Sequence, residues 1–345
     1  MASASNPPVL SFPRQTFAKL SPAPFLHAHL KPTTKGAPIS RPNGRAPNSF
    51  RTATAHTSSL SHASGSAVVR TGDTACVCGV RGEILLARDV PGQRFEGGNG
   101  LRGPTTGADE IAELGLVVPN IELSTGCSPA HIPGQPPSTL AQSLSQRILK
   151  LLQSSKLIDP ADLRIWHDPR AILQAMDTED GDEDAQPEVK AFWVLYIDIL
   201  FISLDGNPFD VAWAAVLASL SDTHLPRAHW DIDNEMVVCS PSKDFAHKLR
   251  LDGFPLPASF AVFSTGRGAS KEAWVLADPD DFEEGLCTEE ISLVVDCSGK
   301  ETRILRIEKS GGGAVGIEEI RALVALAEGR WQEWKDIIHK ASSSL

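Results

Sequence analysis

The densest group of side chains able to do chemistry is an acidic stretch in the last third of the chain. It reads ADPDDFEEG over residues 277–285 and directly follows a segment with strand character. Carboxylates gathered at the end of a strand can bind magnesium or act as a general acid. Acidic loops at strand ends are also common because they keep a surface soluble. The residue types alone therefore leave both interpretations open.

Two other segments carry weaker signals. The run HWDID at 229–233 alternates a histidine with two carboxylates, but no second cluster completes a metal site and a solvated strand edge explains it equally well. The run SGGG at 310–313 precedes a helix, where backbone N–H groups attract anions, yet it lacks the GK[ST] ending and the GxGxxG spacing. We expect a flexible turn there. No GxSxG or similar motif indicates a catalytic nucleophile.

The six cysteines do not indicate a metal site. They include no CxxC pair and have no histidine at zinc-ligand spacing, since they stand at positions 76, 78, 127, 239, 287 and 297. Cys76 and Cys78 are two apart in a strand pattern, so both should point to one face and pack as small hydrophobic residues. This cysteine usage indicates a reducing, intracellular compartment.

Charge is distributed unevenly along the 345 residues. The formal net charge is −11, but residues 1–72 hold eight Lys or Arg and none of the 43 acidic residues. A basic leading segment on an acidic body can be an arm that faces nucleic acid, a segment that docks a partner, or an organellar transit peptide. No apolar run approaches the roughly 20 residues that cross a bilayer, so we expect no membrane span.

Strand and turn signals organise the segments that must position these side chains. Residues 65–84 read GSAVVRTGDTACVCGVRGEI, with β-branched and small residues on both sides of Thr71-Gly72-Asp73, which predicts a β-hairpin. The run FWVLYIDILFISLDGN predicts a long buried strand or a strand pair that closes at Asp205-Gly206-Asn207. An apolar helix should follow from Pro208, a residue favoured at the first helical position.

The remaining pattern predicts further strands and helices separated by two long loops. Helices are expected at 22–30, with Ser21 as a cap, from Ser138 to Ser155, and from Gly316 along a face that starts at Ile317. Strands are expected near 50–57, 114–123, 235–240, 259–264, 273–277, 290–296 and 302–309. Residues 88–113 and the acidic run 177–188 read as loops. Strands followed by helices, twice over, indicate an α+β architecture of two similar halves.

Six short motifs, taken in order, make the chain similar to a known family. They are FAKLSPAPFLHAHL, RPNGR, the pair Phe50-Arg51, DGN followed by a helix, ADPDDFEEG and EKSGGG, arranged around the hairpin. In this order they resemble the RNase PH-like subunits of the eukaryotic RNA exosome core ring, from about Phe17 to the C-terminal helix. RPNGR differs from the usual RPDGR, and VRGE stands where VKAE or VKGE is common. Each motif alone is weak, so the order carries the resemblance.

The resemblance implies an RNase PH fold, with a ribosomal protein S5 domain 2-like first half and an RNase PH C-terminal half. On this basis residues 1–15 are a flexible N-terminus, 16–195 the first half with insertions at 88–113 and 168–188, and 196–345 the second half. A third insertion falls near 264–273. The opening hairpin then belongs to the first central sheet and is mainly scaffold.

The resemblance also implies partners. Six related chains would close into a ring around an RNA channel, so the expected partners are other RNase PH-like exosome ring subunits, S1/KH cap subunits and single-stranded RNA, without a membrane and without a cofactor. The candidates for the RNA-facing or partner-facing side are basic residues in or near the RPNGR loop and the hairpin, namely Arg41, Arg45, Arg51, Arg70 and Arg81.

Catalysis is the point at which this sequence departs from the active members of the family. Those members bind inorganic phosphate with a Gly-Gly-Thr type of turn before a helix, because a doubly charged anion needs N–H and O–H donors aimed at it. Here the turn reads Asp205-Gly206-Asn207-Pro208, in which the proline has no N–H and the aspartate repels phosphate. Asp278 matches a family acid that assists the leaving group, but one carboxylate is not a catalytic set. We expect Asp205, Gly206, Asn207 and Asp278 to be vestigial positions.

The sequence therefore favours a non-catalytic ring subunit that supports 3'-to-5' RNA processing and degradation, including rRNA processing and mRNA decay, in the nucleus, nucleolus and cytoplasm. One alternative is an active phosphate-dependent 3'-to-5' exoribonuclease. Another is an organelle-imported enzyme whose acid-free N-terminus is a transit peptide. Against the latter, a mitochondrial presequence needs a helix, and prolines interrupt residues 7–24.

Overall fold

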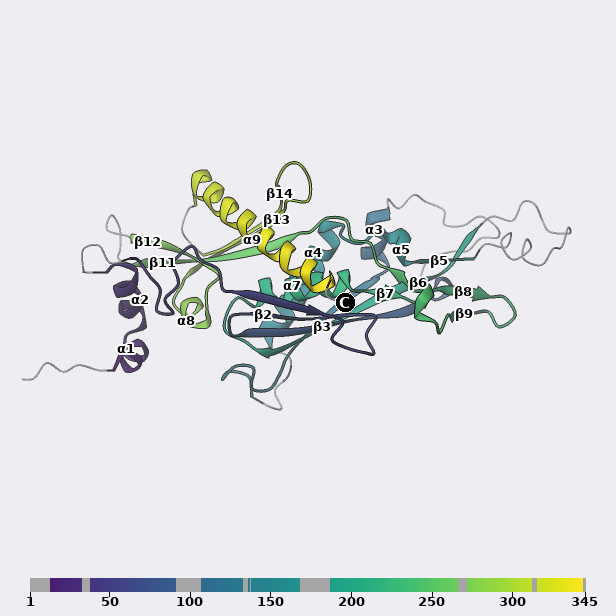
Figure 1. Cartoon of the computed structure of the whole chain (residues 1–345), viewed down its shortest axis with the longest axis horizontal. Coiled ribbons are helices and arrows are strands. Elements are labelled where there is room, and N and C mark those ends of the chain that lie inside the picture. Colours follow the sequence, from purple (N-terminus) through teal and green to yellow (C-terminus); the bar gives the residue numbers. More distant parts are fainter. Residues whose placement is uncertain are drawn as a thin grey trace, which may run out of the picture.

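Two β-sheets, one from each half of the chain, form the frame of the molecule (Figure 1). The computed structural model describes residues 13–32, 38–90, 107–132, 136, 138–167, 187–265, 272–311 and 315–343. Helices α1 and α2 lie at one end of the elongated molecule and the β8–β9 hairpin lies at the other (Figure 1). The predicted α+β class is confirmed, since helices pack on both sheets.

The first sheet has six strands in the order β1-β2-β3-β6-β4, with β5 also paired to β6. Its strands are β1 Ala53–Thr57, β2 Gly65–Thr71, β3 Thr74–Leu86, β4 Val117–Leu123, β5 Arg164–His167 and β6 Glu188–Ser203. The predicted hairpin is confirmed as β2 and β3, because Thr71 pairs with Thr74 across the two-residue turn. The second predicted segment is a single long strand, β6, which runs antiparallel to β3 and parallel to β4.

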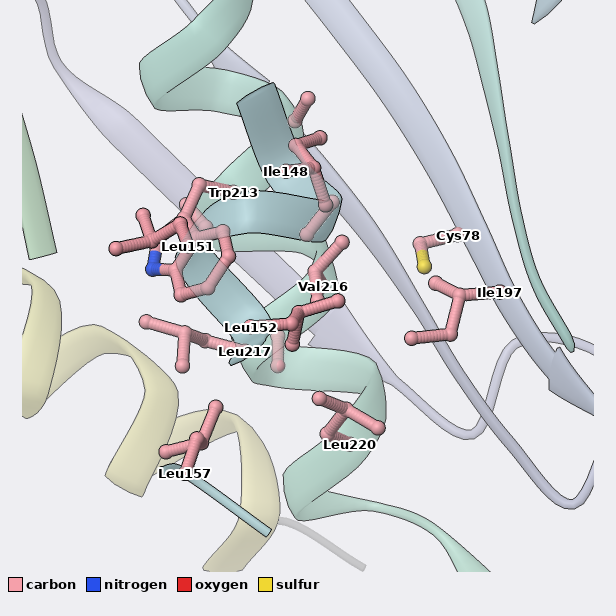
Figure 2. Close-up of a cluster of buried hydrophobic side chains, with 14 of the residues drawn as sticks. Cys78, Ile148, Leu151, Leu152, Leu157, Ile197, Trp213, Val216, Leu217 and Leu220 are labelled. Carbon is pink, nitrogen blue, oxygen red and sulfur yellow. The ribbon is translucent and has the colours of Figure 1, made fainter. Parts of the chain in front are cut away.

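The helices that the structure describes cover one face of this sheet. Alternate residues of β6, namely Leu195, Ile197, Ile199 and Phe201, are almost completely buried on that face. Helices α4 Thr139–Ser155 and α7 Pro208–Ser221 pack there, and Figure 2 shows their apolar side chains gathered with Cys78 and Ile197 of the sheet. Cys76 and Cys78 are buried as small hydrophobic residues, as predicted, and burial raises the pKa of the Cys78 thiol to about 12.

The second sheet has four antiparallel strands in the order β12-β11-β13-β14. They are β11 Leu256–Thr265, β12 Glu272–Ala277, β13 Glu289–Asp296 and β14 Arg303–Ser310. Helix α9 Ile317–Ser343 packs on β11 and β13, and α2 Pro22–Leu30 packs through Leu26 and Leu30 against Phe263 and Leu276. All strands predicted in this part of the chain are present, with ends that differ by a few residues.

The smaller elements connect the sheets. The helices are α1 Arg14–Leu20, α3 Gly107–Glu113, α5 Pro160–Leu163 and α8 Asp281–Glu284, with single 3₁₀ turns at Ala87–Asp89 and Lys243–Phe245. The short strands β7 His224–Leu225 and β10 His247–Lys248 pair with each other, as do β8 Ala228–Asp231 and β9 Met236–Cys239. Among the described residues, no helix is both long enough and apolar enough to span a membrane.

Several predicted boundaries are wrong. The division between residues 195 and 196 falls inside β6, which lies wholly in the first sheet, so the two halves separate later along the chain. Residues 107–113 form helix α3 instead of a loop, and helix α1 already begins at Arg14. Ile317 is 71% exposed, because the apolar face of α9 becomes buried only from Leu323 onwards.

Some predictions lie outside the described residues. These are the first twelve residues, most of the loop predicted at 88–113, all but the last two residues of the acidic run 177–188, most of 264–273, and two glycines of the SGGG run.

Candidate functional site

The four vestigial positions predicted from the sequence lie together where the two sheets meet. Chain segment 204–207 connects the end of β6 to the first turn of α7, and Asp278 directly follows β12. The side-chain amide of Asn207 donates a hydrogen bond of 2.8 Å to Oδ1 of Asp278, which joins the two segments. We call the residues around this contact the junction site.

The backbone of the junction site depends on glycine. Gly206 has a φ of +70°, and Asn207 and Asp278 also lie in the left-handed region, with φ of 48° and 50°. A Cβ atom on Gly206 would lie 2.5 Å from the carbonyl carbon of Asp280 and 2.6 Å from the backbone nitrogen of Asp281. Both neighbours are backbone atoms, so they cannot rotate away. The close approach of the two segments therefore requires glycine here.

Arg51 is the central cation of the site, and it is fully engaged by the protein. Its Nε and Nη2 donate to the two carboxylate oxygens of Asp278 at 3.0 and 2.8 Å, and its backbone N–H donates to Oδ2 at 2.9 Å. Nη1 and Nη2 also donate to the carbonyl oxygens of Asp205 and Gly206. Arg51 is 7% exposed and Asp278 is 1% exposed. The guanidinium has thus no free side to offer to an anion.

The charges of this pair stabilise each other. Burial acts to raise the pKa of Asp278, but the hydrogen bonds and the charge of Arg51 outweigh it and hold that pKa well below its ordinary value. Burial acts to lower the pKa of Arg51, and Asp278 more than offsets this, so the pKa is raised. Both groups are therefore charged at neutral pH.

Glu284 occupies the anion-binding end of α7. Its Oε1 accepts a hydrogen bond of 2.6 Å from the backbone N–H of Asn207, the residue that precedes the helix. Free N–H groups at a helix N-terminus are where phosphate binds in many proteins. Pro208, the next residue, has no N–H to donate. Burial raises the pKa of Glu284 to about 7, so the carboxylate is held in this position at the cost of desolvation.

Asp210, in the first turn of α7, accepts hydrogen bonds from further donors near this helix N-terminus. Its Oδ2 accepts hydrogen bonds of 2.8 Å from the side chain of Asn207 and from the backbone of Ser259, and its Oδ1 accepts one from the Ser259 hydroxyl. Burial raises the pKa of Asp210. The N-terminus of α7 is therefore surrounded by carboxylates of the same chain.

The RPNGR loop supplies two further cations, of which Arg41 is buried. Arg41 is 1% exposed, donates to the carbonyl oxygen of Ala277, and has its Nε 3.4 Å from Oε1 of Glu283. Burial lowers the pKa of Arg41 to about 10 and raises the pKa of Glu283, which means that desolvation outweighs their attraction. Arg45 donates to the carbonyl oxygens of Ser49 and Asp278.

The prediction that Arg41 and Arg51 face RNA or a partner is therefore wrong, and for the half-buried Arg45 it stays a prediction. The physical reason is the density of acidic groups at the junction site, which draws the guanidinium groups of Arg41 and Arg51 inward as internal partners. Arg70 and Arg81 do lie on exposed strand positions, where they form ion pairs of 3.3 Å with Asp73 and 3.2 Å with Glu83. Their assignment to an RNA-facing or partner-facing side stays a prediction.

The acidic stretch after β12 has a structural role. Asp280 accepts a hydrogen bond from the backbone N–H of Glu283, and Glu283 accepts one from the backbone N–H of Asp280, so the two form a capping box that starts α8. Among the described residues, no group of three or more metal-ligating side chains could hold a metal ion. The described residues of this stretch therefore offer no magnesium cluster.

Sequence reasoning missed the role of Glu284. The D-x-x-E spacing of Asp280 and Glu283 is a signal for a helix start and could have been read as one. No signal in the sequence indicates that Glu284 reaches the start of α7, because that contact joins residues 77 positions apart.

Comparisons with known proteins agree with this fold. Residues 49–226 match the profile of the RNase PH family, described as 3' exoribonuclease family, domain 1. The chain is 33% identical over 312 residues to exosome complex component rrp43 of Schizosaccharomyces pombe, which covers 90% of this chain and 93% of that protein. It is 27% identical over 287 residues to exosome complex component Rrp42 of Methanothermobacter thermautotrophicus, with 83% and 85% covered.

Solved structures extend the similarity to both halves of the molecule. A chain in a structure described as the Archaeoglobus fulgidus exosome with RNA bound to the active site superposes with a TM-score of 0.59 at 19% identity. The superposition covers 91% of this chain and 96% of the other. A chain of an archaeal exosome core superposes with a TM-score of 0.53 and covers 88% and 91%. The expected RNase PH fold is confirmed.

Proposed function

This chain belongs to the RNase PH family, and from that premise we propose that it is a non-catalytic subunit of an RNA exosome core ring. In this role it supports 3'-to-5' RNA processing and degradation by shaping an RNA channel and docking neighbouring chains, and it does not cleave RNA itself. The names of the curated relatives, exosome complex components, and the coverage of about nine-tenths of the first of them support this proposal.

One observation carries the non-catalytic part of the proposal. The backbone N–H that leads into α7 is already bonded to Glu284, and the central guanidinium is already bonded to Asp278. A phosphate ion would have to displace two carboxylates that the protein itself supplies. The displaced Asp278 carboxylate would then be left buried without its partner, which is strongly unfavourable.

The local charge balance supports the same conclusion. Seven carboxylates lie in or beside the junction site, against the three guanidinium groups of Arg41, Arg45 and Arg51; they are Asp205, Asp210, Asp278, Asp280, Asp281, Glu283 and Glu284. A phosphate dianion brought among these groups is repelled by each carboxylate that is ionised, and inside a protein that repulsion is stronger than in water. Attack of phosphate on an RNA linkage needs the opposite arrangement.

We further propose that the partners are other RNase PH-like ring subunits, S1/KH cap subunits and single-stranded RNA, and that the protein works in the nucleus, including the nucleolus, and in the cytoplasm. Six cysteines that are all free in the structure are compatible with a reducing compartment. RNA affinity within a ring would depend on phosphate contacts from lysines and arginines, and it would fall steeply as salt increases.

The test of this function uses the purified full chain. It is incubated with end-labelled single-stranded RNA and inorganic phosphate, next to a phosphorolytic RNase PH family member as the positive control. We expect no release of nucleoside diphosphates from this chain. Release that requires phosphate, and that disappears when Asp278 is replaced by alanine in a variant shown to be folded, would instead establish an active exoribonuclease.

A further inference from the structure

The outer face of the first sheet is apolar where a solvated face would be polar. An antiparallel sheet with one face toward water normally alternates apolar inward and polar outward residues. On the outward positions of β6, however, Leu200 is 37% exposed and Ile202 is 54% exposed. Neighbouring strands extend this surface, because the half-buried Val77 pairs with Leu200 and with Val68. No helix among the described residues packs on this face.

A groove runs across this face with a volume of about 520 Å³. Its floor is formed by Val77, Gly79 and Leu200, and one wall is the loop after β1, which brings Leu60 over the sheet. The Leu60 side chain lies directly over Gly79, since a Cβ on Gly79 would lie 3.2 Å from Cδ1 of Leu60. We call this the outer groove.

The opposite wall of the outer groove is acidic. Glu122 of β4 pairs with Leu200, and Asp198 of β6 pairs with Gly79 and with Asn120. Glu122 forms no ion pair with any described residue, and Asp198 only accepts a hydrogen bond of 3.3 Å from the side chain of Asn120. The cation nearby, Arg81, is paired with Glu83. The groove thus combines an apolar floor with two exposed carboxylates that lack a cationic partner among the described residues.

We propose that the outer groove binds a neighbouring protein chain through one large apolar side chain that is flanked by a lysine or arginine. The apolar side chain would lie on Val77 and Leu200, beside Leu60, and the cation would pair with Glu122 or Asp198. Two effects would stabilise such a complex. Exposed apolar surface would become buried, and the unpaired carboxylates would gain a cationic partner. This inference rests on the proposed function, which supplies the neighbouring chains.

RNA fits the groove poorly. Its phosphates would approach the two unpaired carboxylates, and the one ring among the described lining residues is the imidazole of His62 in the loop wall. A protein segment with a large apolar residue and a basic residue can cover the apolar floor and pair with the carboxylates of the wall.

The test begins by measuring which RNase PH-like chains of the same organism bind this protein. Each is purified and titrated against the immobilised full chain by biolayer interferometry. For a chain that binds, two groove variants are compared with the unaltered protein: Leu200→Lys, which places a cation on the apolar floor, and Glu122→Lys, which reverses the wall charge. Matched controls are Ile304→Lys, an isoleucine 45% exposed on β14, and Glu301→Lys, an exposed glutamate before that strand.

We expect Leu200→Lys to weaken binding by about 100-fold and Glu122→Lys by about 10-fold, as for the centre and edge of an interface. Both controls should bind within about 2-fold of the unaltered chain, and thermal unfolding should confirm that all four variants are folded. If a family chain binds but the groove variants bind equally well, the groove is not the docking site while the proposed function stands. If no family chain binds, the proposed function itself fails. Loss of RNA binding in Leu200→Lys without loss of protein binding would also overturn the inference.

Discussion

The junction site and the outer groove differ in how their functional groups are satisfied. At the junction site the central donors already have partners from the same chain, with Arg51 on Asp278 and the N–H of Asn207 on Glu284. In the outer groove the apolar floor and the carboxylate of Glu122 have no partner among the described residues. The central polar groups of the junction site are thus paired within the chain, whereas the outer groove leaves apolar surface and a carboxylate exposed.

This difference shows that family membership alone does not identify which surface of the chain binds a ligand or a partner. The junction site is the place where the family resemblance puts phosphate chemistry, yet its groups are consumed in holding the two sheets together. Its residues should therefore matter for stability and little for ligand binding. The outer groove should behave in the opposite way.

The largest difference in the free energy of unfolding is expected between alanine variants of two aspartates, Asp278 and Asp198. Replacing Asp278 by alanine leaves the buried Arg51 without its countercharge and should lower the free energy of unfolding by about 3–5 kcal/mol. Replacing Asp198, an exposed aspartate in the wall of the outer groove, should change it by less than about 0.5 kcal/mol. Urea unfolding of both variants measures the two values. Equal effects would mean that the junction site is not the more internally satisfied region.

A second contrast concerns two glycines with positive φ. Gly206→Ala forces a Cβ against the backbone of Asp280 and Asp281 and should cost about 2–4 kcal/mol. Gly126→Ala has a similar φ of +83° but no atom within 4 Å, so it should cost only about 1 kcal/mol of backbone strain. Thermal unfolding of the pair separates steric clash from strain. A Gly206→Ala variant as stable as Gly126→Ala would show that the two segments are not held in close approach.

The smallest expected effect is a change in the free energy of unfolding with pH. The folded state raises the pKa of Glu284 to about 7, so it holds the proton more tightly than the unfolded chain does. The contribution of Glu284 to stability is therefore highest in acid and is lost as pH rises toward and through 7. A glutamine at this position cannot ionise but can still accept the hydrogen bond from Asn207. Glu284→Gln should thus gain about 1–3 kcal/mol relative to the unaltered chain between pH 5 and pH 8.

Urea unfolding at the two pH values measures this gain. The control is Glu122→Gln, the same substitution at an exposed glutamate of the outer groove that does not contact the start of α7. A flat difference for Glu284→Gln would mean that the Glu284 carboxylate is not desolvated against the start of α7.

The features that could be predicted from the sequence are the local ones. The hairpin at Thr71-Gly72-Asp73, the helix start at Pro208 and the helix that begins after Ser138 each depend on neighbouring residues, and the structure has all three. Ser21, the expected cap of the helix at 22–30, precedes that helix but makes no side-chain capping hydrogen bond. Grouping Asp205, Gly206 and Asn207 with Asp278 needed the family resemblance, because only the fold brings β6 and β12 to one place. Periodicity alone could not supply that.

The parts that failed are those set by tertiary contacts. Arg41 and Arg51 look like surface cations in a polar, proline-rich segment, and nothing local indicates that they enter a cluster of carboxylates more than 200 residues away. The apolar outward positions of β6 were also invisible, since FWVLYIDILFIS reads as buried on both faces. Only the sheet order and the placement of α4 and α7 on one side expose Leu200 and Ile202.

The central claim is that the anion-binding position before α7 is filled by the chain itself. It is tested most directly by following the backbone amide resonances of Gly206 and Asn207 by NMR during a titration with inorganic phosphate, with chloride at matched ionic strength as the reference. The account predicts that neither amide shows a saturable shift at millimolar phosphate beyond that seen with chloride. A saturable shift of the Asn207 amide that is specific to phosphate would contradict it.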